Sequence, residues 1–229
     1  MNRPQKLRNP ANPEEASAVN PKRSYRGSRR ETQKRMTQAR VLECALELFA
    51  ERGFEAASLR EIAGRAGVTH ALIRLHFGSK AQLWQSAVDY LFRRMQTEMR
   101  PRPDELDYTD GADGVELFVR RYVAYCARHP EHARLMLMES MHDSDRLRYA
   151  VDKHIRPAHR FLESMLIAAS KDIHGLEAAP AHLAYIVAAA SQLVFALAHE
   201  ARGIYGVDVL DEEFVARHAD AVVNLLFKR

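Results

Sequence analysis

The sequence predicts an all-α protein, and three observations support that prediction. Glycine is sparse, with 10 residues among 229, and proline accounts for 9, which suits long helices. Apolar residues recur with helical spacing from about residue 33 to the end, and no segment reads convincingly as a strand. Hydrophobic residues make up 47% of the chain, which is typical of a globular protein. We expect about nine helices, divided between a small N-terminal domain and a larger C-terminal one.

The first thirty residues differ from the rest in composition. They hold four prolines, few apolar residues and many basic ones, and they predict a disordered basic arm. Residues 1–80 carry 16 Lys and Arg against 8 Asp and Glu, whereas the remainder carries 18 against 22. A basic first third joined to a mildly acidic body indicates that the N-terminal part alone meets a polyanion.

The helical period begins near Gln33, with a stripe formed by Val41, Leu42, Ala45, Leu48 and Phe49. Gly53 is expected to end this helix. Ser58 and Glu61 form a capping-box pattern that starts a second helix, which ends at Gly67.

A third, short helix is capped by Thr69 and runs through about His76, before Gly78. Ser79 then caps a fourth helix that extends to Pro101.

The second half of the chain also has helical periodicity, over residues 115–128, 131–141, 145–169, 181–202 and 211–227. Pro157 predicts a kink within the third of these segments. Leu183 to Ala198 is uncharged, but it is shorter than the roughly 20 residues that a bilayer requires. It also contains Ser191 and Gln192, so we interpret it as a buried helix. With no secretory signal in residues 1–30, we expect a cytoplasmic protein without a membrane partner.

Two short helices separated by Gly67 and Val68, on a basic background, form a helix-turn-helix pattern. In such a motif the first helix braces across the phosphates and the second approaches the base edges with its N-terminus. Small or polar residues are therefore needed at the start of the second helix, and His70, Ala71 and Leu72 provide them.

The amino-acid sequence of this region identifies the type of motif more specifically than the spacing of the two helices does. Segments 40–54, 58–63, 66–69 and 76–80 together resemble the DNA-binding domain of the TetR family, over about residues 34–80. Beyond residue 100 the resemblance is one of helix order and size. It implies a basic arm over 1–30, a helix-turn-helix domain over 31–80 and an effector-binding and dimerisation domain over 81–229. The implied function is a repressor that binds a palindromic DNA operator as a homodimer and is released by a small-molecule effector.

The resemblance also assigns roles to residues of the motif. Ser58 and Lys80 would contact phosphate, Arg60 would contact phosphate or a base edge, and the helix capped by Thr69 would attract phosphate at its N-terminus. The implied DNA-binding residues are Ser58, Arg60, Thr69, His70, Ala71, Leu72, Arg74, His76 and Lys80.

Arg74 departs from the family, which usually has tyrosine at this position. An arginine there can bind phosphate or read guanine, and the sequence leaves the two roles open. His76 has an alternative role as a neutral histidine packed against the first helix.

The family resemblance places the dimer interface on the last two helices, 181–202 and 211–227. Their apolar spacing supports this assignment independently, and the alanines at 188–190 permit close approach of two helices. The alternative is an ordinary monomer core.

The resemblance further implies a small-molecule pocket in the C-terminal half, for which residues of plain core are the competing interpretation. Gln192 and His199 are the most suggestive candidates, because they are polar residues in an apolar helix and a buried polar group needs a partner. The candidates are Tyr122, Tyr125, Met136, Met138, Met141, His142, Phe161, Met165, Gln192, Phe195 and His199.

Other classes of function find little support. Cys44 and Cys126 form no CxxC pair, and His129 and His132 flank Pro130, so we expect neither a metal nor a disulfide. No glycine-rich phosphate loop or nucleophile motif is present, so we expect no enzyme and no cofactor. Two alternatives stay open: an activator, and a helical ligand- or partner-binding protein without operator binding. The second is favoured by Arg74 and by the apolar Leu72 and Leu75.

Overall fold

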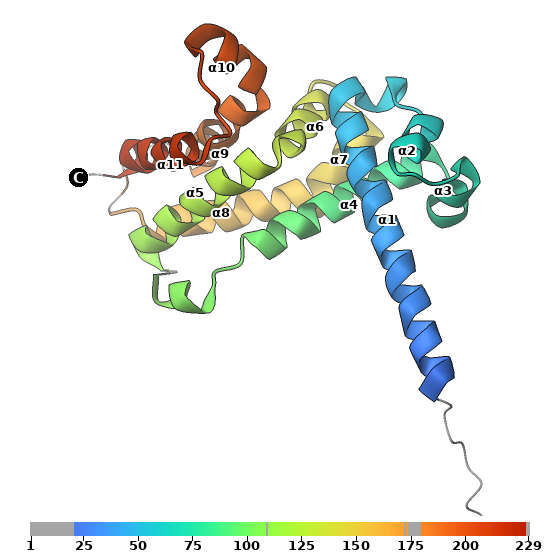
Figure 1. The fold of residues 1–229 in the computed structure, drawn as a ribbon. Coiled ribbons are helices and arrows are strands. Elements are labelled where there is room, and N and C mark those ends of the chain that lie inside the picture. Colours follow the sequence, from blue (N-terminus) through green and yellow to red (C-terminus); the bar gives the residue numbers. More distant parts are fainter. Residues whose placement is uncertain (1–20, 109, 172, 174–179, 228–229) are drawn as a thin grey trace, which may run out of the picture. The chain divides into compact units, whose positions relative to one another are not determined.

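The computed structural model describes residues 21–108, 110–171, 173 and 180–227, with side chains described for these except 21–29, 106–108 and 180. The described residues are almost entirely helical, which confirms the predicted fold class (Figure 1). The chain divides into two compact units, residues 1–39 and residues 40–229, and each is described by itself.

Helix α1 spans Pro21–Ala56, so it starts well before Gln33. The prediction of disorder is therefore wrong for residues 21–30, and residues 1–20 lie outside the described part of the chain. Proline suits the first position of a helix, where its missing N–H would have no acceptor, and the lysine and arginines that follow are good helix formers. Gly53, with φ 74°, interrupts the helix where the sequence predicted its end.

Helices α2 (Leu59–Arg65) and α3 (His70–Phe77) form the predicted helix-turn-helix. The Ser58 and Thr69 hydroxyls accept hydrogen bonds from backbone N–H groups three residues later, at 3.1 and 3.2 Å. Only half of the predicted capping box forms, because the Glu61 carboxylate turns to arginine side chains. Gly67 connects the helices with φ 61°, a left-handed conformation that glycine adopts without strain.

Helix α4 spans Lys80–Glu98 and begins with a complete capping box between Ser79 and Gln82. Gly78 precedes it with φ 74°, and a Cβ atom there would lie 2.2 Å from the Gln82 Oε1 atom. The short turn between α3 and α4 therefore requires glycine.

Two clusters of buried residues form the core. The first joins α1 to α4, around Phe49, Ile62, Ile73 and Trp84, and also contains Leu135 and Ala150 from the second half of the chain. The second is built by the C-terminal helices, and Met95 of α4 packs against both. Helix α4 thus belongs to both cores, so the predicted boundary at residue 80 does not coincide with a gap in packing.

The second core is built from α5 (Gly111–Arg128), α8 (Arg156–Ala168), α9 (Pro180–Ala196) and α11 (Glu212–Leu226) (Figure 1). A 3-10 turn over Pro103–Tyr108 precedes α5.

Helices α6 (Pro130–Ser140) and α7 (Asp145–Ala150) lead into a π-helical turn, η2, over Val151–Ile155. This turn lies at the predicted kink. The N–H of Arg156 donates to the carbonyl of Val151, and Pro157 has no N–H with which to continue the ordinary pattern.

The single helix predicted over 181–202 is wrong, because the chain breaks at Leu197 into α9 and α10 (Ala198–Tyr205), bent by 72°. Neither glycine nor proline lies at the break. Instead Arg134 of α6 donates its Nε–H to the Ala196 carbonyl at 2.9 Å, at the C-terminal end of α9. Among the described residues no single helix is long and apolar enough to cross a membrane, although α9 and α10 taken together pass that test of length and composition.

Candidate nucleic-acid interface

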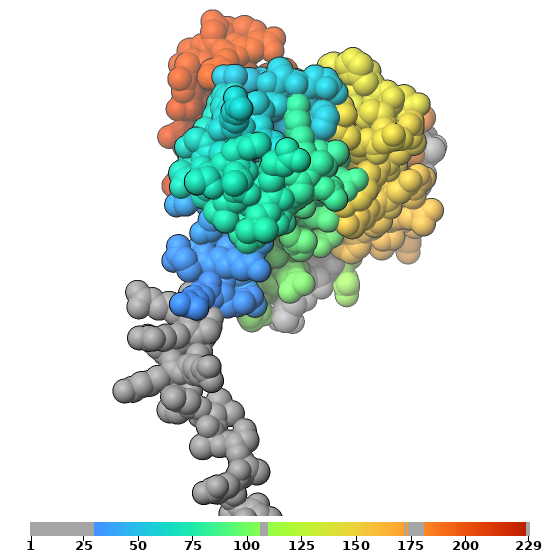
Figure 2. Space-filling view, turned by 90° about the vertical axis from the view of Figure 1, so that its right-hand side faces the viewer, coloured from blue at the N-terminus to red at the C-terminus, as the bar shows by residue number. Residues whose placement is uncertain are grey.

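Helix α3 has one buried anchor and one exposed face. Ile73 is 1% exposed and packs into the first core, which fixes the rotation of the helix. Ala71, Arg74 and Leu75 consequently share the opposite, exposed face, and Leu75 is 78% exposed. Figure 2 shows this part of the chain, coloured between cyan and green, on the side that faces the viewer.

Leu75 was not among the predicted DNA-binding residues. Its spacing would have found it, because Leu75 lies four residues after Ala71 and beside Arg74, on one helical face. His70 and Leu72, which were predicted to face bases, are half-buried. The exposed face therefore combines one guanidinium with small and apolar surface, which suits phosphate and the methyl groups of thymine.

Ion pairs hold α2 against α1 and leave other cations exposed. Arg65 donates to Glu51 at 2.7 Å, and Arg52 donates to Glu61 at 2.9 Å. The hydrogen bond from Arg65 lowers the pKa of Glu51. Arg60 and Arg74 are exposed and form no ion pair within residues 40–108, so both guanidinium groups are available to phosphate.

Lys80, predicted to contact phosphate, also makes contacts within the protein. Its Nζ atom donates to the Glu55 carbonyl at 3.0 Å and lies 4.6 Å from the centre of the Phe54 ring. The ammonium thus tethers the last turn of α1 to the start of α4. An ammonium has three donors, and this tether uses one of them, so a phosphate contact by Lys80 stays a prediction.

The same aromatic ring connects the helix-turn-helix to the C-terminal half. The guanidinium of Arg146 lies 4.0 Å from the centre of the Phe54 ring. Arg146 also donates to Glu139 at 3.1 Å, and that carboxylate is only 6% exposed. Arg146 of α7 thus connects Glu139 of α6 to Phe54 at the end of α1.

Asp89 forms a second connection, between α4 and the π-helical turn. Its carboxylate accepts hydrogen bonds from Tyr149 at 2.8 Å, Lys153 at 2.8 Å and His154 at 2.7 Å. Burial alone would raise its pKa, but these donors lower it. The His154 ring also stacks on Phe92, with centroids 4.6 Å apart.

The predicted effector residues do not gather in one place. Tyr122 of α5 donates to the Gln192 amide oxygen of α9 at 3.1 Å, so the buried partner that Gln192 needed is a neighbouring side chain. Phe161 is 58% exposed on α8, and Phe118 lies between the Tyr122 and Phe161 rings, 5.8 and 6.4 Å from them. Met165 is half-buried in the same core.

The remaining candidates point elsewhere. Met138 lies beside Gly53 at the end of α1, while His142 and Met141 are exposed near the end of α6, and Met136 packs into the first core. His199 is exposed on α10, because the break at Leu197 turns it away from the core. Phe195 is fully buried against His218. Helical spacing alone could not separate these faces, since several helices of the body are apolar on more than one side.

Tyr125 belongs to a buried polar pair. Its hydroxyl lies 2.9 Å from His132 Nδ1, and both residues are buried. Burial lowers the pKa of His132 to about 3 and raises that of the Cys126 thiol to about 12. Within the described residues no three His, Cys, Asp or Glu side chains are placed to hold a metal ion.

A capped helix-turn-helix with an exposed cationic and apolar face, followed by a helical body, defines the class of helix-turn-helix DNA-binding folds. A family model described as bacterial regulatory proteins of the tetR family matches residues 41–87. A second, described as the tetracyclin repressor-like C-terminal domain, matches residues 112–226. The chain belongs to this TetR family.

Individual relatives resemble parts of the chain. A transcriptional repressor of Mycobacterium tuberculosis is 49% identical over 53 residues, which cover 23% of this chain and 28% of the relative. The repressor SCO4008 of Streptomyces coelicolor is 30% identical over 105 residues, which cover 46% of this chain and 50% of the relative. These matches therefore span at most half the length of either relative.

Solved structures resemble the whole fold. AibR, in complex with isovaleryl coenzyme A and operator DNA, has a TM-score of 0.66 at 18% identity, covering 83% of this chain and 98% of AibR. The ketosteroid regulator KstR2 of Mycobacterium tuberculosis has a TM-score of 0.63 at 15% identity, covering 84% of this chain and 95% of KstR2. At these identities the likeness establishes the fold.

Proposed function

We propose that this protein is a transcriptional regulator that binds a palindromic operator in double-stranded DNA. The observation that carries the proposal is the exposed face of α3, with Ala71, Arg74 and Leu75 beside a capped helix N-terminus. Base edges in the major groove offer acceptors to arginine and methyl groups to apolar side chains. Family membership and the repressor names of the relatives support the same function.

The regulator acts as a homodimer through segments 181–202 and 211–227. Support comes from large apolar side chains that these helices leave in solvent, including Tyr185 at 68%, Ile186 at 56% and Leu225 at 75% exposure. A twofold axis between two copies covers the same patch on each, and a palindromic operator matches that symmetry.

A small-molecule effector releases the dimer from its operator. AibR, a regulator of the same fold, binds both isovaleryl coenzyme A and operator DNA in one complex, which supports the presence of an effector site here. The links from Arg146 to Phe54 and from Asp89 to η2 offer a route from the C-terminal helices to the DNA-binding helices. We assign the protein to gene regulation in the cytoplasm and not to enzymatic catalysis.

The predicted domains keep their roles in this proposal. Residues 31–80 bind the operator, residues 81–229 bind the effector and the partner, and the basic residues before Glu31 add affinity for DNA. Helix α4, which contributes to both cores, joins the two functions.

A gel-shift experiment tests operator binding. The full chain is mixed with genomic fragments and excess nonspecific competitor, beside the variants Arg74→Ala/Leu75→Ala and Arg160→Ala/Ile167→Ala. The second pair is a matched control, because Arg160 and Ile167 are both exposed on α8, outside α3 and outside the two proposed dimer segments.

We expect the wild type and the control to shift a specific fragment and the α3 variant to lose that shift, with equal helical circular dichroism. A wild type that shifts no fragment above competitor contradicts the proposal and favours a ligand- or partner-binding protein. An α3 variant with full affinity contradicts the assignment of the face.

A further inference from the structure

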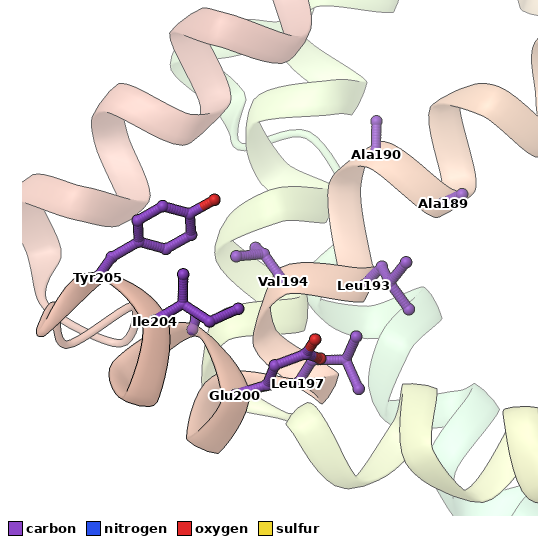
Figure 3. Close-up of a pocket in the computed structure, with 9 residues that line it drawn as sticks. Ala189, Ala190, Leu193, Val194, Leu197, Glu200, Ile204 and Tyr205 are labelled. Atoms are coloured by element: carbon purple, nitrogen blue, oxygen red, sulfur yellow. The ribbon is translucent and has the colours of Figure 1, made fainter.

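An apolar groove lies between α9 and α10, on the solvent side of the second core (Figure 3). Its volume is about 480 Å³. The α9 wall includes Ala189 and Leu193, Leu197 lies at the break, and the α10 wall includes Glu200, Ile204 and Tyr205. Several of these apolar residues are well exposed, with Ile204 at 62% and Tyr205 at 74%. A groove of this composition gains free energy when another apolar surface fills it.

Helix α10 has no buried residue of its own. Ala198 and Ala201 pack at the edge of the second core, whereas Ile204 and Tyr205 of the same helix stay in solvent. At the break between the two helices, the half-buried Arg134 guanidinium donates to the Ala196 carbonyl. The chain thus builds a groove and supplies nothing among its described residues to fill it.

The groove is continuous with the exposed face of α9. Helix α9 contains no Asp, Glu, Lys or Arg, and one face of it, continued by Leu197 at the break, is exposed to solvent. This face consists of His182, Tyr185, Ile186, Ala189, Leu193 and Leu197. The last three of these also line the groove. An occupant that covers this face therefore reaches the groove as well.

We infer that a second copy of this chain fills the groove: the first turns of the partner's α9, carrying the partner's Tyr185, lie between α9 and α10. The inference rests on the proposed homodimer and adds its register. In a symmetric contact one residue meets its own copy, and Ala189, small and midway along the face, allows the closest approach. Leu193 then lies opposite the partner's Tyr185, and Leu197 lies opposite the first turn of the partner's α9, beside the partner's His182.

The charges at the groove agree with this register. Glu200 is the one charged residue that lines it. An α-helix carries partial positive charge at its N-terminus, and α9 begins at Pro180. In the symmetric arrangement the first turn of the partner's α9 approaches Glu200, so the helix dipole and the carboxylate have opposite signs at both ends of the contact.

Cysteine cross-linking tests the register in the full chain. The double variant Tyr185→Cys/Ile204→Cys is oxidised and run on a non-reducing gel beside each single variant and Ile167→Cys/Ile204→Cys. Tyr185 lies about 18 Å along α9 from Leu197 at 1.5 Å per residue, and α10, bent by 72°, carries Ile204 further from Tyr185. A disulfide needs Cα atoms within about 7 Å, so a bond between cysteines at 185 and 204 must join two chains.

We expect a covalent dimer from Tyr185→Cys/Ile204→Cys alone, and its loss on reduction. We also expect Ile204→Ser/Tyr205→Ser to weaken dimerisation about tenfold or more by sedimentation, as removal of a buried interface anchor does. Phe161→Ser/Ile167→Ser removes comparable exposed apolar surface from α8 and should leave dimerisation unchanged.

The outcomes separate this inference from the homodimer itself. If the wild type sediments as a dimer but the cysteine pair gives no covalent dimer, the register is overturned and the homodimer stands. An unchanged dimer affinity in Ile204→Ser/Tyr205→Ser overturns the groove contact in the same way. A wild type that remains monomeric overturns both.

Discussion

The buried histidine His132 should make the stability of this protein fall between pH 7 and pH 5. Its ring is 7% exposed, lies 2.9 Å from the Tyr125 hydroxyl and packs edge-on against Phe92. Burial holds its pKa at about 3, against 6.5 for an ordinary histidine. Below pH 6.5 the unfolded chain gains a proton that the folded chain does not bind until about pH 3.

The expected loss follows from that difference. At pH 5 the solution is about 1.5 pH units below the pKa of an ordinary histidine, and each unit stabilises the protonated unfolded chain by about 1.4 kcal/mol. The free energy of unfolding should therefore be about 2 kcal/mol lower at pH 5 than at pH 7. Asp89 and Glu131 have pKa values lowered by their donors, although burial opposes this. Their contributions persist above the usual carboxylate range near pH 4 and decline only below it, so they lie outside this window.

Urea unfolding at pH 7 and pH 5, at one fixed protein concentration, measures the loss. The variant His132→Asn keeps a polar partner for Tyr125 without a titrating ring, so its free energy of unfolding should fall by about 2 kcal/mol less than that of the wild type. His142→Asn removes an exposed histidine and serves as the control. Equal losses in the wild type and His132→Asn would refute the reasoning.

Three further predictions concern DNA binding and assembly. The position of Arg74 late in α3 favours a phosphate contact, so Arg74→Lys and Arg74→Tyr should keep much of the affinity for the operator. If operator variants changed one base pair at a time show a loss of about 1–3 kcal/mol at a single G·C pair, Arg74 contacts guanine instead. Lys80→Ala should weaken binding to all sequences and flatten the salt dependence measured by titration, and an unchanged slope would leave Lys80 with its tether to Glu55 alone. The double variant Leu193→Glu/Leu225→Glu should be monomeric by light scattering and should lose operator binding. Leu193, exposed at 41%, suits this test better than the half-buried Val194. Dimers that persist in this variant would place the interface elsewhere.

The sequence by itself determined the features that depend on neighbouring residues. The caps at Ser58, Thr69 and Ser79 and the glycine turns at Gly67 and Gly78 were all predicted, because each is decided by hydrogen bonds or backbone angles within a few residues. The helix-turn-helix follows from these local signals. The spacing of apolar residues also predicted the all-α fold, because helical periodicity is a property of the chain itself.

Only the tertiary structure decided the features that join distant residues. The break at Leu197 has no local signal, and the side chain that donates to the carbonyl beside it belongs to Arg134, which lies 62 residues before Ala196. Spacing could not show that Tyr122 satisfies Gln192, or that His199 turns outward while His132 is buried. Several helices are apolar on more than one side, so the choice of buried face is made by the helices that pack against them and not by the periodicity of any one segment.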